Sequence, residues 1–210
     1  MEKLLVHPAY FGSIHQFSAI SQTQKLIFEN EDNYQKQTYR TRQYIYGANG
    51  KLLLNIPIKH NKQKKTHQKY RDVRIENSFL WQLNHWRSLE AAYRTSPFFE
   101  FYEDEIKPLY EKRFSFLLDF NLTCFETISA CLQLDKDFSK TEEYQTPEEV
   151  DQQVTDYRNL IDAKKEVEFQ QEKYTQVFEE KFGFIKNLSV LDLLFNEGPN
   201  SLNYLEQQSL

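Results

Sequence analysis

The order of apolar segments in the first 28 residues constrains the fold more than any other feature of the sequence. Leu4-Leu5-Val6 is a short apolar run closed by Pro8, as expected for a buried strand. After Gly12 the apolar residues take a helical spacing, and Lys25-Leu26-Ile27-Phe28 has the composition of a second strand. Strand, helix and strand in this order favour a parallel pair with a right-handed crossover. We therefore expect an α/β fold that begins with a small sheet containing a βα unit.

A β-hairpin is predicted after this unit. Gly47-Ala48-Asn49-Gly50 separates the apolar stretches 44–46 and 52–58, and Asn-Gly is the strongest short hairpin signal. Residues 59–69 contain no apolar side chain, so we expect an exposed polar loop there. The alternation in residues 72–75 predicts one more strand.

From Ser78 onward the apolar residues follow the period of helices, which predicts a mainly helical C-terminal half packed on the sheet. Ser96-Pro97 is typical of a helix start, with the serine as the cap and the proline in the first turn. Pro108 should kink that helix or begin another. Thr123-x-x-Glu126 fits a capping box at the start of a further helix.

The acidic, polar segment 135–153 is predicted to be an exposed connection, and 154–182 to hold one or two amphipathic helices. Ser189 can cap a short helix at 190–195 that Gly198-Pro199 terminates. A chain of 210 residues is long enough for one domain with its own core. We expect a single domain, 1–210, made of an α/β part, a helical part, the acidic connection and the C-terminal helices (1–76, 77–134, 135–153 and 154–210).

The segment 33–42 is the predicted ligand-binding surface. It combines Tyr34 and Tyr39 with the cations Lys36, Arg40 and Arg42, and it contains no aliphatic residue. Unpaired cations are costly to bury, so the segment must face water, a ligand or a polar network. Arginine forks suit phosphate, sulfate or carboxylate groups. The alternative is a solvated surface with ordinary ion pairs.

Three histidines are candidate catalytic residues. His7 and His15 lie at the end of the first predicted strand and just after it, where ligands usually bind in open α/β sheets. His85 lies on an apolar helical stripe, so a half-buried histidine with one hydrogen bond is the alternative to a general base.

Several classes of function are disfavoured. The net charge of −5 argues against a general nucleic-acid binder, although the cation-rich stretch 59–74 leaves RNA association as a third possibility. Cys124 and Cys131 are too far apart on a helix for a disulfide, and no metal-binding spacing occurs. No segment is long enough to span a membrane or to act as a signal peptide, so we expect a cytoplasmic protein.

Several motifs together resemble the WbqC-like protein family, in particular its short branch from Bacteroidetes-type bacteria. The matching segments span nearly the whole chain: Pro8-x-Tyr10-Phe11, 33–42, Ala48-Asn49-Gly50, Ile56-Pro57, Trp81, His85-Trp86, Ala92-Tyr93, 96–100, 118–121 and 187–199. The longer members of the family have Gln-Pro where this chain has His7-Pro8, and Asp-Asp-Val-Gln where it has residues 30–33. Lys36 and Arg42 match the family pattern.

The resemblance implies a role in surface-polysaccharide or O-antigen biosynthesis, with glycine or another acyl group transferred to an amino sugar. Our leading hypothesis is therefore a group-transfer enzyme that acts on an anionic small molecule or a nucleotide-linked substrate. The alternative is a non-catalytic module that binds an anionic metabolite, a nucleotide or a protein. The sequence identifies neither a cofactor nor an oligomeric state.

Overall fold

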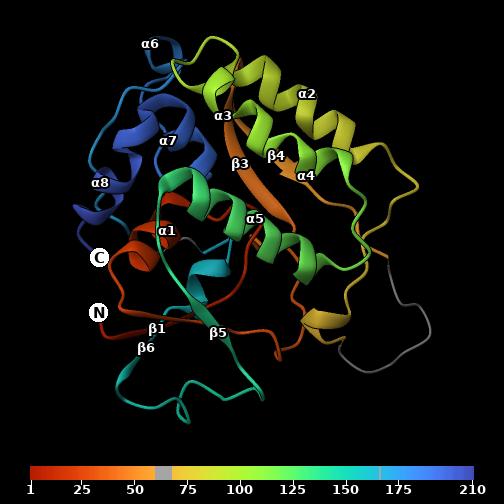
Figure 1. Cartoon of the computed structure of the whole chain (residues 1–210), viewed down its shortest axis with the longest axis vertical. Helices are drawn as coiled ribbons and strands as arrows, with labels where there is room; N and C mark the ends of the chain where they lie inside the picture. The colour runs from red at the N-terminus through yellow and green to blue at the C-terminus, as the bar shows by residue number, and fades with distance from the viewer. Residues whose placement is uncertain (60–67, 166) are drawn as a thin grey trace.

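A four-stranded parallel sheet forms one end of the molecule (Figure 1). The structure is a computed structural model that describes residues 1–59, 68–165 and 167–210. The strand order is β5-β2-β1-β6. The strands are β1 (Lys3–Val6), β2 (Lys25–Phe28), β5 (Phe138–Lys140) and β6 (Val154–Asp156).

The predicted βα unit is confirmed. β1 pairs in parallel with β2, in a register from Lys3 opposite Lys25 to Val6 opposite Phe28. Helix α1 (Ile14–Ser21) connects the two strands, and the Ser13 hydroxyl caps it by accepting a hydrogen bond from the Gln16 backbone N–H at 3.3 Å. The chain is therefore α/β, as the first 28 residues predicted.

The acidic segment and the residues directly after it provide two strands that were not predicted. β5 lies in the segment expected to be only a connection, and β6 lies where a helix was expected. Each has three residues, too few for an alternating pattern to be recognised in the sequence. Pairing with β2 and β1 decides their conformation. Between β6 and residue 182 the helical pieces are short, namely η2 (Arg158–Ile161) and α6 (Glu179–Phe182).

The predicted hairpin is also confirmed. β3 (Arg42–Gly47) pairs with β4 (Gly50–Asn55), and Gly47 lies opposite Gly50. Gly50 has a φ of 98°, which favours glycine at this turn. The strand expected at 72–75 is instead the 3₁₀ turn η1 (Tyr70–Asp72) followed by isolated bridges at Arg74 and Ile75.

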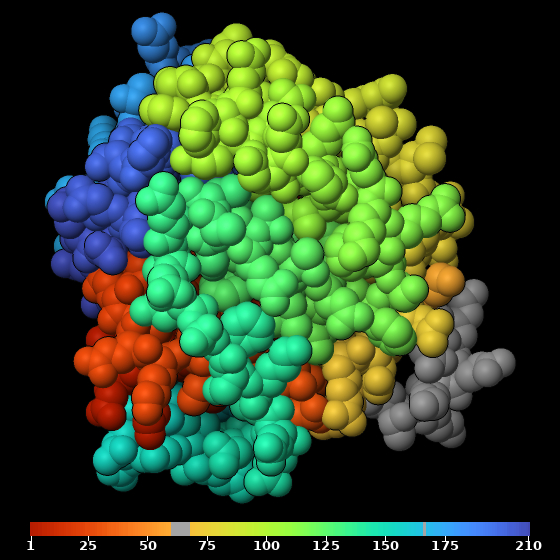
Figure 2. Space-filling view, in the orientation of Figure 1, coloured from red at the N-terminus to blue at the C-terminus, as the bar shows by residue number. Residues whose placement is uncertain are grey.

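The helices lie over the hairpin and beside the sheet, and α5 crosses the front (Figure 1). In the space-filling view α5 occupies the middle of this face, with α7 and α8 to one side (Figure 2). The helices not yet introduced are α2 (Trp81–Tyr93), α3 (Phe99–Ile106), α4 (Pro108–Glu111), α5 (Leu117–Leu132), α7 (Val190–Glu197), η3 (Gly198–Asn200) and α8 (Ser201–Glu206).

Two of the four predicted helix starts are wrong. Pro108 begins α4 and Ser189 caps α7, as predicted. Ser96 is not a cap, because its hydroxyl donates back to the Tyr93 carbonyl and α3 starts later. Thr123 lies inside α5, where its hydroxyl donates to the Asp119 carbonyl. In both cases a hydroxyl bonds the preceding turn instead of opening a new helix.

Two further expectations concern the polar loop and the absence of a membrane-spanning segment. Most of the predicted polar loop, residues 60–67, lies outside the described residues. Among the residues that the structure describes, no helix is long and apolar enough to span a bilayer.

A buried carboxylate, Asp192, connects α7 to the chain around it. Tyr93 donates its hydroxyl to Asp192 Oδ1 at 2.7 Å, and Tyr174 and Gln176 donate to Oδ2. The Tyr93 oxygen in turn accepts the backbone N–H of Tyr46 in β3 at 3.0 Å. Burial raises the pKa of Asp192 from 3.8 to about 6, although these donors oppose the rise. Asp192 therefore holds the C-terminal segment against the hairpin.

We predict that Asp192→Asn removes a pH-dependent part of the stability. A carboxyl whose pKa is raised in the folded state stabilises folding below its unfolded value and loses that contribution as the pH rises. The rise from 3.8 to about 6 corresponds to about 3 kcal/mol. The free energy of unfolding of the wild type, relative to the variant, should fall by this amount between about pH 4 and about pH 7. Urea unfolding of both proteins across this pH range measures the change. A difference in unfolding free energy that stays constant with pH would contradict the raised pKa of Asp192.

We also predict that residues 182–210 are required for folding. Leu188, Val190, Leu191, Leu193, Leu194 and Phe195 are all fully buried. Burial of each such side chain contributes about 1.5–3 kcal/mol, so the segment rivals the ~5–15 kcal/mol of a whole domain. Truncation after Lys181 should give an insoluble protein, or a molten one whose near-ultraviolet circular dichroism signal is lost. Removal of the exposed Ser209 and Leu210 alone is the control and should leave the protein folded. If the chain truncated after Lys181 also stayed folded, residues 182–210 would be a tail that folding does not require.

Candidate functional site

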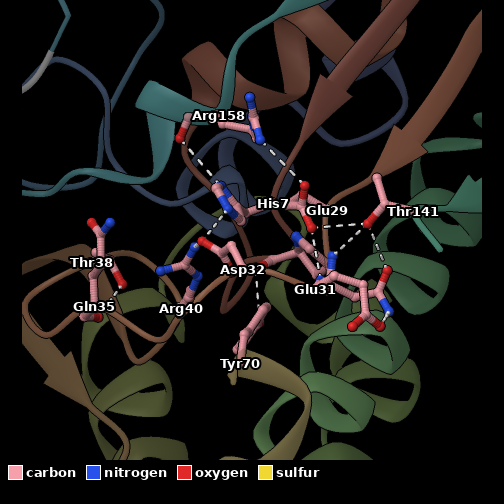
Figure 3. Close-up of polar contacts among 12 residues, drawn as sticks. His7, Glu29, Glu31, Asp32, Gln35, Thr38, Arg40, Tyr70, Thr141 and Arg158 are labelled. Atoms are coloured by element: carbon pink, nitrogen blue, oxygen red, sulfur yellow. Dashed lines mark hydrogen bonds and ion pairs between the residues drawn. The ribbon is translucent and has the colours of Figure 1, made fainter. Parts of the chain in front are cut away.

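Charged and polar residues collect where the parallel strands end. His7 directly follows β1, Glu29 follows β2 and Thr141 follows β5, while Asp156 and Arg158 lie at the end of β6. Figure 3 shows His7, Glu29, Thr141 and Arg158 lying close together at the ends of separate strands. From β1 the chain continues to its neighbour β2 on one side, whereas β6, which comes last in the chain, lies on the other side of β1. The direction in which strands are added to the sheet therefore reverses between β1 and β6. Ligands of open α/β sheets bind outside the carboxyl ends at such a point.

The loop after β1 holds His7 in place. Phe11 and Gly12 both have positive φ, 53° and 39°, which turns the chain sharply into α1. A side chain at Gly12 would lie 2.7 Å from the Gln16 amide oxygen, so glycine is required there. The Gln16 amide donates to the carbonyl of His7 at 2.7 Å. The tight turn therefore fixes the backbone of His7 against the first turn of α1.

His7, Asp32 and Arg40 form a buried charge network. Asp32 Oδ2 lies 2.9 Å from His7 Nε2 and accepts a hydrogen bond from Arg40 Nη2 at 2.5 Å (Figure 3). Arg40 is 0% exposed, and its guanidinium lies 4.9 Å from the centre of the Tyr70 ring. The loop between β2 and β3 thus folds its charges inward, over the end of β1.

The network changes the acidity of both ionisable partners. Burial lowers the pKa of His7 to about 4, and the positive charge of Arg40 adds to this effect. Burial alone would raise the pKa of Asp32, but the hydrogen bonds and charges of His7 and Arg40 outweigh it and lower that pKa. The pair therefore combines a weak imidazole base with a strongly acidic carboxyl group.

A second ion-pair cluster lies beside the first. Asp156 forms a bidentate pair with Arg158, through Nε at 2.9 Å and Nη2 at 2.6 Å. Arg158 Nη1 donates to the fully buried Glu29 at 3.3 Å, and Glu29 also accepts the hydroxyl of Thr141 at 2.9 Å. The cluster links the ends of β6, β2 and β5. It meets His7 through the Arg158 carbonyl, which is 3.3 Å from His7 Nδ1.

Several buried polar atoms of this region have no hydrogen-bond partner among the described residues. They include Nε and Nη1 of Arg40, Nε of Arg42 and Oδ1 of Asp32. Burial raises the pKa of Tyr34, whereas a hydrogen bond with Thr41 and the charges of Arg40 and Arg42 lower it. Both guanidinium groups therefore act on the Tyr34 hydroxyl. Donors of this kind suit a carboxylate, sulfate or phosphate group.

The predicted binding residues differ in their exposure. Lys36 is exposed, and Tyr34 and Arg42 are half-buried. Tyr39 is buried, with its backbone bonded to Tyr10 and Ile161. Arg40 is not on the surface, because Asp32 draws its guanidinium into the interior. The surface expected from the sequence is therefore layered, with Lys36 outside and Arg40 inside.

The structure does not bring the three candidate histidines together in one cluster. His15 stacks on Phe169, with 4.2 Å between ring centres. His85 Nδ1 and the Tyr10 hydroxyl share a hydrogen bond at 2.9 Å, in a chain that continues to the Tyr110 hydroxyl. Burial lowers the pKa of His85 to about 4. Of the three, His7 is the histidine that contacts the charge network.

Sequence reasoning did not single out Glu29, Asp32 and Arg158 as site residues. Asp32 lies just before the predicted binding segment 33–42, and Arg158 follows a strand too short to predict. The one local signal is the spacing Asp156-x-Arg158, which permits the bidentate pair. No group of metal-binding side chains occurs within residues 1–59, 68–165 and 167–210. Both cysteines are free thiols, and burial raises the pKa of Cys131 to about 11.

Comparisons with known proteins give two matches. A model described as the WbqC-like protein family matches residues 7–168 and 152–204. The chain is also 24% identical over 212 aligned positions to "Uncharacterized protein Rv1507c" of Mycobacterium tuberculosis, with 90% of each chain covered. No solved structure matches the chain.

We predict that Asp32→Asn strongly destabilises the fold. The Arg40 charge would then be buried without its carboxylate, and breaking a buried pair in this way costs about 3–5 kcal/mol. The loss should be largest near neutral pH. It should shrink as the pH falls below 3.8, because the lowered pKa of Asp32 makes its contribution disappear on protonation. Denaturant unfolding measures the change, with the exposed Asp104→Asn as control; equal stability of the two variants would contradict it.

Proposed function

The chain belongs to the WbqC-like protein family, and from this membership and the buried cations of the site we propose that it is a group-transfer enzyme that binds an anionic substrate. The family resemblance suggests surface-polysaccharide or O-antigen biosynthesis, with glycine or another acyl group passed to an amino sugar. The substrate would be an anionic small molecule or a nucleotide-linked sugar. The proposal places its binding site under the loop 33–37.

One observation carries the proposal: three buried N–H groups of Arg40 and Arg42 have no partner among the described residues. An unsatisfied buried donor costs about 1–3 kcal/mol, and more when it is charged. A bound anion would satisfy these donors and offset that cost. Arg40 is already oriented by Asp32 and Tyr70, so little side-chain entropy would be lost on binding.

The exposed and half-buried residues suggest how the ligand enters. Lys36 is exposed, whereas Arg42 and Tyr34 are half-buried. Gln37, at the end of this loop, has a φ of 64°, an uncommon value for a residue other than glycine. We propose that the loop 33–37 opens to admit the anion. Lys36 would attract it first, and the arginines would then bind it.

The pair His7 and Asp32 would handle the proton that group transfer requires. An acceptor amine or hydroxyl must lose a proton, and the leaving group must gain one. Asp32 Oδ1 is buried and has no partner in the described part of the chain, so it can also accept a hydrogen bond from an amino group. An acceptor that carries an amine, such as an amino sugar, fits this arrangement.

We predict that Arg42→Lys weakens anion binding roughly ten- to hundredfold. A charge-assisted hydrogen bond is worth about 1.5–3 kcal/mol, and about 1.4 kcal/mol corresponds to a factor of ten. Lysine keeps the charge but loses the planar fork. The measurement is calorimetric titration with nucleotide-sugars and phosphorylated metabolites, with Lys36→Ala as a second variant.

The matched control is Arg113→Lys, because Arg113 is an exposed arginine on another part of the surface. Thermal melts should be alike for Arg42→Lys, Arg113→Lys and the wild type. Normal binding by Arg42→Lys and Lys36→Ala would place the ligand site elsewhere.

A non-catalytic binding module is the second candidate, and a specific observation favours it. His7, His15 and His85 are 5%, 5% and 7% exposed, so no candidate base is open to solvent. A binding module would hold the anion without converting it. Incubation with donor and amino-sugar acceptor, followed by mass spectrometry, separates the candidates, because only the enzyme changes the acceptor mass.

A further inference from the structure

The turn that leads into α2 presents large apolar side chains to solvent. Phe79 and Leu80 are 64% and 71% exposed, and Leu83, in the first turn of α2, is 42% exposed. Leu80 occupies the N-cap position of α2, where its side chain makes no capping hydrogen bond. Serine, threonine, asparagine and aspartate are strongly preferred over leucine at such a position. Neither packing nor capping therefore explains these three side chains, which we call the apolar tip.

Hydrogen bonds fix the turn on both sides of the apolar tip. Asn77 donates its side-chain amide to the Phe114 carbonyl at 2.8 Å, and its amide oxygen accepts the Trp81 indole N–H at 3.3 Å. The Trp81 side chain itself is buried. The backbone between positions 77 and 81 is thus anchored at each end, and the two side chains between the anchors point outward. Their exposure is a feature of the folded turn, which lies at the margin of the molecule in Figure 1.

Cations without carboxylate partners lie beside the apolar tip. Gln82 donates to the Lys112 carbonyl at 2.6 Å, which places residue 112 next to the first turn of α2. The Lys112 ammonium lies 5.1 Å from the centre of the Phe114 ring. The Arg74 guanidinium lies 5.0 Å from the centre of the Phe116 ring, and Arg74 and Phe116 form an antiparallel bridge. Neither cation forms an ion pair with a carboxylate of the described residues.

The charge around the apolar tip is opposite to that of the whole chain, which has a net charge of −5. Glu76 is the only acid in residues 74–87 and 112–116. Arg87 adds an exposed cation to α2, four residues after Leu83 and so on the same face of the helix. The apolar tip is therefore flanked by positive charge on α2 and on the neighbouring segment.

We propose that the apolar tip and its cations form a docking surface for an anionic phospholipid bilayer. Phe79 and Leu80 enter the interface, and Arg74, Arg87 and Lys112 contact lipid phosphates. A bilayer places hydrocarbon directly beneath a layer of phosphate groups, so it accepts protruding apolar side chains and flanking cations together. Nucleic acid would attract the cations but offers no apolar region to leucine, and a protein would need a pocket shaped to the tip. This inference does not rest on the proposed function.

The test is sedimentation of the full-length protein with vesicles made of equal parts phosphatidylglycerol and phosphatidylcholine, beside vesicles of phosphatidylcholine alone. The wild type should sediment with the anionic vesicles and not with the neutral ones, and added salt should weaken this binding. The double variant Phe79→Ser, Leu80→Ser should bind the anionic vesicles roughly tenfold more weakly or worse, because apolar insertion is lost. The matched control is Phe101→Ser, which should bind as the wild type does. Phe101 is 69% exposed, but it lies on α3, whose sequence FEFYEDEI contains no cation.

A second pair of variants tests the cations. Arg74→Gln with Lys112→Gln should weaken binding to the anionic vesicles roughly thirtyfold at physiological salt, since each cation near such a surface contributes to binding. Lys140→Gln with Lys173→Gln removes the same charge from exposed positions in β5 and in the chain before α6, and should weaken binding much less. Thermal melts should be alike for all these variants, because every substituted side chain is exposed.

Three other outcomes would overturn the proposal. The first is a wild type that does not sediment with the anionic vesicles. The second is unchanged vesicle binding by the serine double variant, together with binding of single-stranded RNA by the wild type, which would make the cations a surface for any polyanion. The third is a dimer in analytical ultracentrifugation that the serine double variant dissociates, which would assign the apolar tip to a contact between two copies of the chain.

Discussion

The fully buried guanidinium of Arg40 is the constraint on which the architecture of the site depends. A charge without exposure must be paired, and Asp32 is the carboxylate that pairs with it. The pairing pulls the loop between β2 and β3 down over the carboxyl edge of the sheet, where Asp32 also meets His7. Asn121 of α5 completes the contact, because its amide donates to the Arg40 carbonyl at 2.8 Å and to the Tyr70 hydroxyl at 2.6 Å.

Backbone hydrogen bonds join the three segments that follow β1, β2 and β6. The Tyr10 N–H donates to the Tyr39 carbonyl at 2.9 Å, and the Tyr39 N–H donates to the Ile161 carbonyl at 2.8 Å. Tyr39 is thus a central strut between the other two segments, and its buried ring packs against Tyr44 of the hairpin. The sheet edge, the segment around Tyr39 and the hairpin are thus tied into one support, which suits the proposed anion-binding site.

Other polar networks lie deeper in the helical half and serve a different purpose. Asp192 is held by two tyrosines and a glutamine, and Tyr10, Tyr110 and His85 form a hydrogen-bonded chain. Their donors and acceptors are largely matched to one another, which is what packing of buried polar groups requires. The cluster around Arg40 differs because donors are left over. That surplus of positive donors is the reason for placing binding there.

The sequence by itself determined the βα unit, the hairpin and the cap of α7, because each depends on contacts between residues close in the chain. It also determined that residues 33–42 needed a polar environment, since they offer no aliphatic surface to bury. Only the tertiary structure decided that Arg40 points inward and that Arg158 reaches His7, 151 positions away. β5 and β6 likewise exist because distant strands offer them partners, and three residues carry too little local preference to become strands alone. Local patterns fix elements, whereas pairing of charges and strands across the chain fixes the site.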